Sequence, residues 1–459
     1  MTQLDLVVRS RRTVTPEGER AAAVAVQGEK IIALYDYAAP LDAAEDIDLR
    51  DLALLPGLVD THVHVNEPGR THWEGFDSAT RAAAAGGVTT IVDMPLNSLP
   101  PTVSVAALEE KLAAARGQCH VDVGFWGGAV PGNVKELAPL HERGVYGFKC
   151  FMSPSGVDEF PPLEHADLRR ALEEIAGFRA PAGGGGLMVV HAEDPALLRE
   201  PAGPTYPEFL ESRPGTSERS AVERVVELAR ETGARVHILH VSSADCLDVL
   251  EAAQAGGVAV TAETCPHYLT LTAEQVPEGA TAYKCCPPIR SEVNRDRLWD
   301  GLARGVLSCV VSDHSPSPAD LKVPDFAAAW GGIASLQLGL PAVWTEASRR
   351  GYGLGDVVRW MSANPAALAE ISGKGGIKPG NDADLVAFDP VADNPVDAAR
   401  LHHKNPVTPY HGRVLKGAVL TTWLRGRPVD GEPHGRFLPA GQRMMAGEPA
   451  EQHMILGEK

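Results

Sequence analysis

The chain has 459 residues, of which 44% are hydrophobic and 22% are charged, so it has enough apolar material for a large core and more than one domain. Its formal net charge of −18 repels nucleic-acid phosphates and anionic lipid, which makes a small molecule a better candidate partner than nucleic acid or a membrane. The sequence begins without an apolar leader and contains no stretch long enough to span a bilayer, so we expect a cytoplasmic protein.

Residues 1–55 contain short apolar runs typical of strands, LDLVVR, AAAVAV and KIIALY, with Gln27-Gly28-Glu29 as the turn between the last two. Residues 371–459 return to short strand-like runs, such as DADLVAFDP and GAVLTTWLRG. These patterns predict that the N- and C-terminal segments together form one discontinuous β-sandwich domain.

Residues 56–370 alternate apolar strands with amphipathic helical segments. After the run at residues 54–64, strands are predicted within 87–95, 120–128, 145–151, 187–194, 235–243, 258–266 and 307–314, and helices lie between them, for example within 103–117 and 218–233. Alternating β and α units with nearly continuous apolar strands favour a parallel sheet. Eight units in about 250 residues or more favour a closed (β/α)8 barrel of the TIM type, in an α/β protein.

Two histidines lie in the run LLPGLVDTHVHVNEPG. Because side chains alternate along a strand, Asp60, His62 and His64 are predicted to share a face, where they could hold one metal ion. The pair alone is equally compatible with two solvated or core histidines.

Further candidate ligands end later apolar strands. Lys149 ends VYGFK, His191 ends LMVVH, His240 ends RVHILH and Asp313 ends SCVVSD. Their spacing fits strands 4, 5, 6 and 8 of the barrel, with the two histidines on strand 1, so all six would meet at the C-terminal ends of the strands. On the same parity argument, His237 faces away from the site and is structural, and His314 is a weaker candidate than Asp313.

Four imidazoles and a carboxylate suit borderline divalent metals, and two such ions lie close together only with an anionic bridge between them. A lysine with a lowered pKa can react with CO₂ to become a carbamate that supplies two oxygens. Lys149 is the candidate for this bridge, although taken by itself it is equally compatible with a salt-bridged lysine.

The chain resembles the cyclic amidohydrolases of the amidohydrolase superfamily, which include dihydroorotases and hydantoinases, and among these it is most similar to the allantoinases. The resemblance spans nearly the whole chain, and it is carried by LPGLVDTHVHVNEPGRTHWEGF, GGVTTIVDMPLNSLPPT, GFKCFMSPSGVDEFP, HILHVSS, TAETCPHYL, CCPPIR, SDHSP and GGIKPGNDADLV. It implies that His62, His64 and Asp313 bind one metal ion, that His191 and His240 bind a second, and that carboxylated Lys149 bridges them. It also implies zinc, with cobalt, manganese or iron as alternatives, and a homotetramer.

The substrate preference rests on a few positions. Dihydroorotases place an arginine, which holds the substrate carboxylate, where this chain has Asn66. A neutral ring such as allantoin needs hydrogen bonds instead of charge pairing. Asn97, Ser153 and Cys286 match positions near the substrate in relatives and are the other predicted substrate contacts.

The resemblance therefore implies hydrolysis of the hydantoin ring of allantoin to allantoate, in purine (ureide) degradation. An ion-activated water would attack the ring carbonyl carbon next to the ureido-bearing carbon, and Asp313 would carry the proton to the leaving nitrogen. A hydantoinase, dihydropyrimidinase or dihydroorotase would share the same ligands, so these activities remain alternatives. A non-enzymatic scaffold related to this family would be expected to lack ligands that this chain retains.

Overall fold

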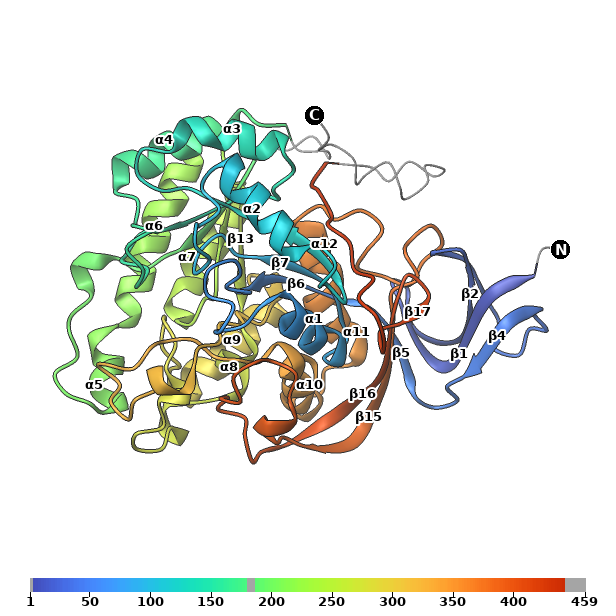
Figure 1. Ribbon diagram of the computed structural model, residues 1–459. Coiled ribbons are helices and arrows are strands. Elements are labelled where there is room, and N and C mark those ends of the chain that lie inside the picture. The colour runs from blue at the N-terminus through green and yellow to red at the C-terminus, as the bar shows by residue number, and fades with distance from the viewer. Residues whose placement is uncertain (1–2, 180–185, 442–459) are drawn as a thin grey trace.

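The computed structural model describes residues 3–179 and 186–441; the predicted C-terminal tail from residue 442 onward lies outside the described residues. The two terminal segments share one eight-stranded sheet at one end of the molecule (Figure 1). Its order is β17-β16-β15-β5-β1-β2-β3, with β4 paired to β1. The strands are β1 (Leu4–Thr15), β2 (Gly18–Gln27), β3 (Lys30–Tyr35), β4 (Ala43–Asp48), β5 (Ala53–Pro56), β15 (Leu385–Pro395), β16 (Val414–Leu424) and β17 (Arg427–Pro428).

The join between the terminal segments is the antiparallel pairing of β15 with β5, in which Leu385 lies opposite Pro56. The turn predicted between β2 and β3 is present, and Gly28 occupies it with a φ of 61°, a conformation that glycine adopts without steric cost.

The central segment forms two parallel sheets. One has the order β6-β7-β8 and the other β14-β13-β12-β11-β10-β9, so each strand lies beside its neighbour in the sequence. The strands are β6 (Leu58–Val63), β7 (Val88–Asp93), β8 (Asp122–Phe125), β9 (Gly127–Gly128), β10 (Phe148–Phe151), β11 (Leu187–His191), β12 (Arg235–Ile238), β13 (Val260–Thr264) and β14 (Cys309–Val310). Each predicted strand of this segment therefore contains an observed one.

The two parallel sheets are linked at both edges. The amide of Trp126, between β8 and β9, donates to the carbonyl of Asp93 in β7. At the other edge, Val63 of β6 forms an isolated parallel bridge with His314, which follows β14.

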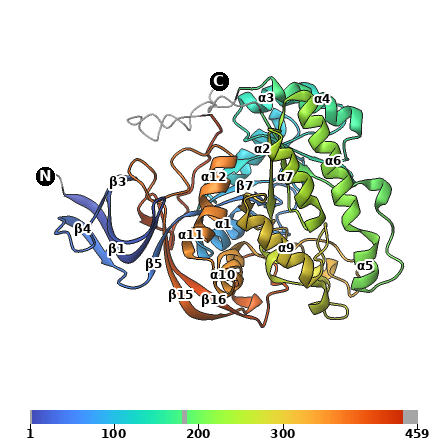
Figure 2. The same cartoon turned by 180° about the vertical axis from the view of Figure 1, so that it is seen from behind.

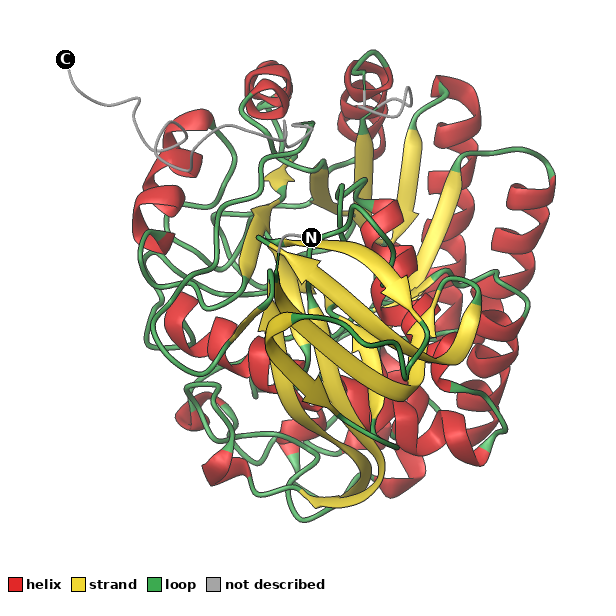
Figure 3. Cartoon of the chain, turned by 90° about the vertical axis from the view of Figure 1, so that its right-hand side faces the viewer, coloured by secondary structure: helices red, strands yellow, loops and turns green. Residues whose placement is uncertain are grey.

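Helices follow the parallel strands and pack around them (Figures 2 and 3). The longer ones are α1 (Phe76–Ala85), α2 (Val105–Ala115), α3 (Val134–Glu142), α4 (His165–Ala176), α6 (Gly215–Thr232), α7 (Leu247–Ala255), α9 (Glu292–Ala303) and α10 (Gly339–Arg349). Shorter ones are α5 (Tyr206–Ser212), α8 (Pro266–Thr270), α11 (Leu354–Val358) and α12 (Asn364–Leu368), with a π-helical turn at Arg359–Ala363. Single 3₁₀ turns lie at Pro195–Leu197, Ala244–Cys246, Ala273–Gln275, Thr281–Tyr283, Ala319–Leu321, Leu336–Leu338 and Ala398–Arg400.

The sequence of α6 shows why these helices lie against the strands. Ala221, Val222, Val225 and Ala229 are buried at a spacing of three to four residues, which places them on one face. Gly233 ends the helix with a φ of 73°, where a residue with a Cβ would be strained.

A buried charged cluster fastens the terminal sheet to the start of β8. The ammonium of Lys374 lies 2.7 Å from Asp122 and 2.7 Å from Asp384, and Arg425 at the end of β16 also pairs with Asp122. These pairs fix the terminal sheet at the end of the parallel strands opposite to the predicted site.

The seven cysteines are all free thiols. Within residues 3–179 and 186–441, no helix combines the length and apolar character needed to cross a bilayer.

Candidate metal centre

The six predicted ligands lie at the carboxyl ends of the parallel strands. His62 lies in β6 and His64 just beyond it, Lys149 lies in β10, and His191 ends β11. His240 and Asp313 follow β12 and β14 by two and three residues, respectively. All six are buried, which gives a polar cluster at one end of an otherwise apolar set of strands.

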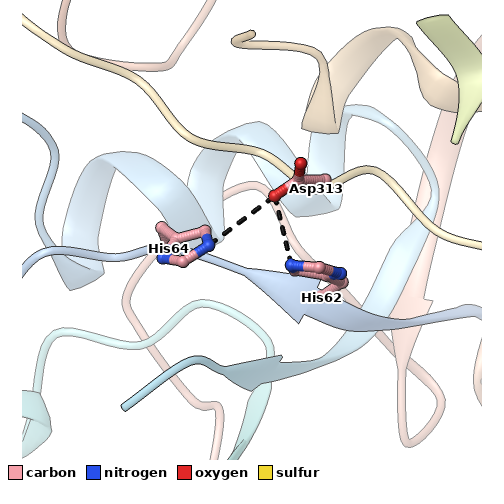
Figure 4. Close-up of side chains that lie close together, drawn as sticks. All are labelled: His62, His64 and Asp313. Atoms are coloured by element: carbon pink, nitrogen blue, oxygen red, sulfur yellow. Dashed lines mark ion pairs between the residues drawn. The ribbon is translucent and has the colours of Figure 1, made fainter. Parts of the chain in front are cut away.

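His62, His64 and Asp313 form the first part of the cluster. Their ligand atoms all lie within 4.8 Å of one another. Asp313 Oδ1 is 3.1 Å from His62 Nε2 and 3.6 Å from His64 Nε2, and both rings point toward the carboxylate (Figure 4). Two imidazoles and a carboxylate in this arrangement could hold one divalent ion.

Asp60 does not join this group, although strand alternation predicted that it would. Its carboxylate accepts hydrogen bonds from the backbone amides of His62 and Ser312, each at 3.1 Å. The pairing of β6 with β7 shifts between Asp60 and Val63, so simple alternation does not hold along this strand. Asp60 therefore connects the backbone of β6 to the segment after β14.

His191 and His240 form the second part of the cluster. His191 Nδ1 lies 3.0 Å from His240 Nε2, and the ring of His240 is 5.3 Å from that of His62. The other nitrogen of His191 is 2.7 Å from Glu193 and donates to that carboxylate, which leaves a lone pair on Nδ1. Two nitrogens that face each other at this distance, close to the ligand spacing around one zinc ion, fit a bound cation between them.

Lys149 is buried, and its ammonium lies 4.8 Å from the centre of the Phe151 ring. Burial lowers its pKa to about 8, against the opposing effect of Asp313 and Glu263. The charge of Lys149 in turn lowers the pKa of His64, His191 and His240, which lie within its electrostatic range. A lysine with this pKa has an accessible neutral amine, the form that reacts with CO₂.

Burial also sets the protonation of the histidines. It is the main cause that holds the pKa of His64 and His240 well below the ordinary value, so both are neutral and able to bind a metal. Burial lowers the pKa of His62 as well, but the carboxylates of Asp313 and Glu263 outweigh it and raise that pKa. A bound divalent ion would replace only the proton on Nε2, which faces Asp313, because Nδ1 keeps its proton toward Glu263.

Two buried carboxylates orient the rings, and sequence reasoning missed both. Glu263 in β13 is 2.5 Å from His62 Nδ1 and 2.9 Å from His237 Nε2. Burial raises the pKa of Glu263, but the two histidines, His62 first, outweigh burial and lower that pKa to about 2. Glu193 holds His191 on one side and Arg213 on the other. Carboxylates that fix the tautomer of a histidine in this way are a regular part of metal sites.

The two histidines judged less important hold different positions. His237 was predicted to face away from the site, and that prediction is wrong. Lys149, Val189 and His237 are paired across neighbouring strands and share a face, and His237 Nε2 lies 2.9 Å from Glu263, the carboxylate that bonds His62. His314 lies 3.2 Å from Glu74 and accepts a hydrogen bond from the Ser335 amide, so it stays outside the ligand group.

Four predicted site residues have a left-handed backbone conformation. The φ angles are 65° at Asn66, 67° at Asn97, 37° at His240 and 45° at Asp313. Such angles are unfavourable for residues with a Cβ and persist where the surrounding structure enforces them, which is common at functional sites. The backbone therefore turns sharply at the positions that direct these side chains.

The predicted substrate contacts lie around the cluster. Asn66 donates to the carbonyl of Pro316 at 3.4 Å, and the amide of Asn97 lies 3.4 Å from His64 Nδ1. Within the described chain, the side-chain oxygen Oδ1 of Asn66 and the hydroxyl of Ser153 are buried without a hydrogen-bond partner. Cys286 is partly exposed in the segment after the 3₁₀ turn at Thr281–Tyr283. Free polar atoms of this kind suit a ligand that hydrogen-bonds.

A second group near Asp313 was not predicted. Cys265 follows β13 and His267 lies in α8, and their ligand atoms lie within 4.8 Å of each other and of Asp313. The only sequence signal was the polar pair Cys265 and His267 on either side of Pro266 after an apolar strand.

The sequence model of the Amidohydrolase family matches residues 53–429. The chain is 57% identical to an allantoinase of Streptomyces avermitilis, over 95% of this chain and 99% of that one. It is 46% identical to an allantoinase of Saccharomyces cerevisiae, over 85% of this chain and 86% of that one.

Among solved structures, it is similar to an L-hydantoinase (dihydropyrimidinase) from Arthrobacter aurescens, with a TM-score of 0.88 and 31% identity over 96% of this chain and 98% of that one. Sequence and structure agree along nearly the full length, and the polar cluster lies inside the matched region. The chain therefore belongs to the amidohydrolase family, and within that family to the allantoinases.

Proposed function

We propose that the chain hydrolyses the hydantoin ring of allantoin to give allantoate, as part of purine (ureide) degradation. The observation that carries this proposal is the similarity to allantoinases. The match to the Streptomyces avermitilis allantoinase has 57% identity and covers 95% of this chain and 99% of that one. The cluster of imidazoles and a carboxylate at the strand ends supplies a site suited to this hydrolysis.

The site is proposed to hold two divalent ions, zinc or else cobalt, manganese or iron. His62, His64 and Asp313 would hold one ion and His191 and His240 the other, with Lys149 as a carbamate between them. The neutral imidazoles of His64 and His240, the close approach of His62 and His64 to Asp313, and the lowered pKa of Lys149 support this assignment. Bound ions would activate water and polarise the ring carbonyl.

Asp313 is proposed as the general base and acid. It would accept a proton from the attacking water as the new C–O bond forms at the carbonyl carbon next to the ureido-bearing carbon. It would then give that proton to the ring nitrogen as the C–N bond breaks, which leaves a ureido group and a carboxylic acid on one opened product; the acid releases the second proton of the water to solvent and becomes a carboxylate. Asn66, Asn97, Ser153 and Cys286 would orient the ring through hydrogen bonds.

The two parallel sheets are proposed to form one closed (β/α)8 barrel, because the Val63–His314 bridge and the Trp126–Asp93 bond connect them at both edges. Residues 56–370 would form this barrel domain, and residues 1–55 and 371–459 would form the β-sandwich domain. The homotetramer and the cytoplasmic location stay predictions, and light scattering of the purified protein would measure the subunit number.

The test of the activity is a substrate panel. The purified enzyme, with its ion content measured, is assayed on allantoin, hydantoin, dihydrouracil and dihydroorotate. Allantoin should give the highest kcat/KM, with allantoate as product. The similarity to a hydantoinase structure makes a hydantoinase or dihydropyrimidinase the main alternative, and a dihydroorotase the third. A higher kcat/KM for any of the other three substrates would replace the proposal.

The test of the bridge is Lys149→Ala. This variant should lose bound ions and turnover together, because the cations would lack an anion between them. Added acetate or propionate should restore part of both, since a small carboxylate can occupy the space of the carbamate. A variant that keeps its ions and full turnover without added acid would refute the bridge.

A further inference from the structure

A second group of possible metal ligands near the carboxyl ends of the strands consists of Cys265, His267 and Asp313. Each offers one ligand atom, the three atoms lie within 4.8 Å of one another, and all three residues are buried. The group shares Asp313 with the metal centre described above, but Cys265 and His267 are outside the proposed ligand set. It is therefore a second group of donors that shares this carboxylate.

His267 gives an independent sign of a ligand. Its side chain is fully buried, and within the described residues neither of its ring nitrogens has a hydrogen-bond partner. Buried polar atoms are nearly always bonded, so an imidazole with two free nitrogens is costly unless something binds it. A thiol, an imidazole and a carboxylate together match the donor preference of zinc and other thiophilic divalent ions.

We propose that Cys265, His267 and Asp313 bind an additional zinc-like ion that inhibits the enzyme. On binding, the S–H bond of Cys265 breaks, a metal–sulfur bond forms, and the proton passes to solvent. Asp313 is able to serve both groups, because its Oδ1 atom faces His62 and His64 while it has a second oxygen.

The ion would act by holding the carboxylate that moves the proton. With Asp313 fixed by the additional ion, its oxygen would no longer be free to accept a proton from water, and turnover would fall as the ion concentration rises. Metal–ligand bonds of about 2.0–2.3 Å place donors roughly 3–4 Å apart, so the three side chains need only a small closing movement. Asp313 is slightly exposed, at 8%, while Cys265 and His267 are at 0%, so the ion would enter from the Asp313 side.

Cobalt(II) is the probe, because a thiolate bound to cobalt gives a near-ultraviolet charge-transfer absorption that imidazole and carboxylate ligands do not give. The enzyme with its resident ions is titrated with cobalt, and both the absorption and the bound cobalt are measured. The wild type should gain this absorption together with one further ion per chain. Absence of the absorption in the wild type would overturn the proposal.

Two variants test the assignment. Cys265→Ser should lose the absorption, and His267→Gln should weaken the additional site by at least roughly 10–100-fold, the loss seen when even an indirect partner of a metal is removed. Cys286→Ser is the matched control, because Cys286 is the partly exposed cysteine of the neighbouring segment, and it should keep the absorption. Loss of the absorption in Cys286→Ser but not in Cys265→Ser would place the site elsewhere and overturn the proposal.

Activity gives the second measurement. Over the cobalt range that produces the absorption, the wild type should lose at least about half of its turnover, and His267→Gln should require a correspondingly higher concentration. Equal inhibition of the wild type and His267→Gln would contradict the inhibitory role. Circular dichroism checks that each variant folds. If Cys265→Ser does not fold, the cobalt affinity of His267→Gln still tests the site. The absorption is measured without substrate. An absent absorption would therefore contradict the additional site without bearing on the proposed allantoin hydrolysis.

Discussion

Asp313 belongs both to the group with His62 and His64 and to the group with Cys265 and His267, and its backbone has a φ of 45°. Burial raises the pKa of its carboxyl group, but the histidines around it, His62 first among them, outweigh burial and hold that pKa well below the ordinary value. Asp313 is therefore ionised at neutral pH, which is the form that accepts a proton.

Asp313→Asn should leave allantoin binding largely intact and reduce kcat by about 10²–10⁴, because a positioned proton carrier contributes that much. The loss of a ligand should add to this effect. Steady-state kinetics and ion content measure both quantities. Asp60→Asn is the matched control, because Asp60 lies in β6 outside the proposed ligand set and accepts from the amides of His62 and Ser312, and its kcat should change far less. A loss of kcat below about tenfold in Asp313→Asn would remove Asp313 from the mechanism.

Asn66 tests the choice of a neutral ring. It is buried at 1% exposure, and its side-chain oxygen Oδ1 has no hydrogen-bond partner within the described residues. Asn66→Arg would therefore place an unpaired cation against the substrate, and kcat/KM for allantoin should fall. Arginine at a φ of 65° is also strained, so Asn66→Gly serves as the control that removes the amide and keeps the backbone relaxed.

Asn66→Gly should fold as well as the wild type and still lose kcat/KM for allantoin. If both Asn66 variants matched the wild type in kcat/KM, Asn66 would lie away from the substrate. The argument that separates this chain from dihydroorotases by that residue would then be withdrawn.

Single residues also show the limits of sequence reasoning. His191 and Lys149 could be found because each is a polar residue at the end of an apolar run. Glu263 could not, because its partner His62 is 201 residues away and only the folded arrangement of the strands brings them together. Asp60 was placed wrongly, because a shift in strand pairing breaks the alternation on which its assignment depended.

At the level of elements, the predicted strands of the central segment are present because they are buried on both faces, so their sequences read as continuous apolar runs. The exact ends were less predictable. β14 spans only Cys309–Val310, and His240 lies beyond the end of β12, because the backbone leaves the extended conformation to turn the ligands into the site. Hydrogen bonding between strands, which the sequence does not display, decides where each one ends.

The charged cluster at the start of β8 leads to a prediction about acid stability. Burial raises the pKa of Asp122, but Lys374 and Arg425 outweigh it and lower that pKa from 3.8 to about 2. A carboxyl group with a lowered pKa stabilises the folded state above its unfolded pKa, and that contribution disappears as the pH falls from about 4 to about 2. A shift of this size corresponds to about 2–3 kcal/mol.

Asp122→Asn should lower the free energy of unfolding at neutral pH by about 3–5 kcal/mol, because it removes the buried carboxylate that Lys374 and Arg425 share. Its stability should also change less than that of the wild type between pH 4 and pH 2. Urea unfolding across this range provides the measurement. Arg11 and Asp51 form an exposed pair, and Asp51→Asn is the control that should change stability by less than about 1 kcal/mol. Parallel pH curves for the wild type and Asp122→Asn would contradict the prediction.

For the whole molecule, the proposed ions should stabilise the fold. An ion that binds only the folded state adds about 2.7 kcal/mol at one hundred times its dissociation constant, so removal by a chelator should lower Tm and re-addition should restore it. Lys149→Ala should show little of this response, because it retains few ions. A chelator that removes the ions without moving the wild-type Tm would show that the site contributes nothing to stability.

The left-handed backbone at Asn66, Asn97, His240 and Asp313 has a consequence for how this enzyme responds to selection. Each position stores local strain that glycine would relieve, but glycine supplies neither a ligand nor an amide. A variant library screened only for heat resistance would therefore favour replacements at the residues that the chemistry needs. In such a library, we expect the most heat-resistant members to include inactive ones, so screening must score turnover and heat resistance together.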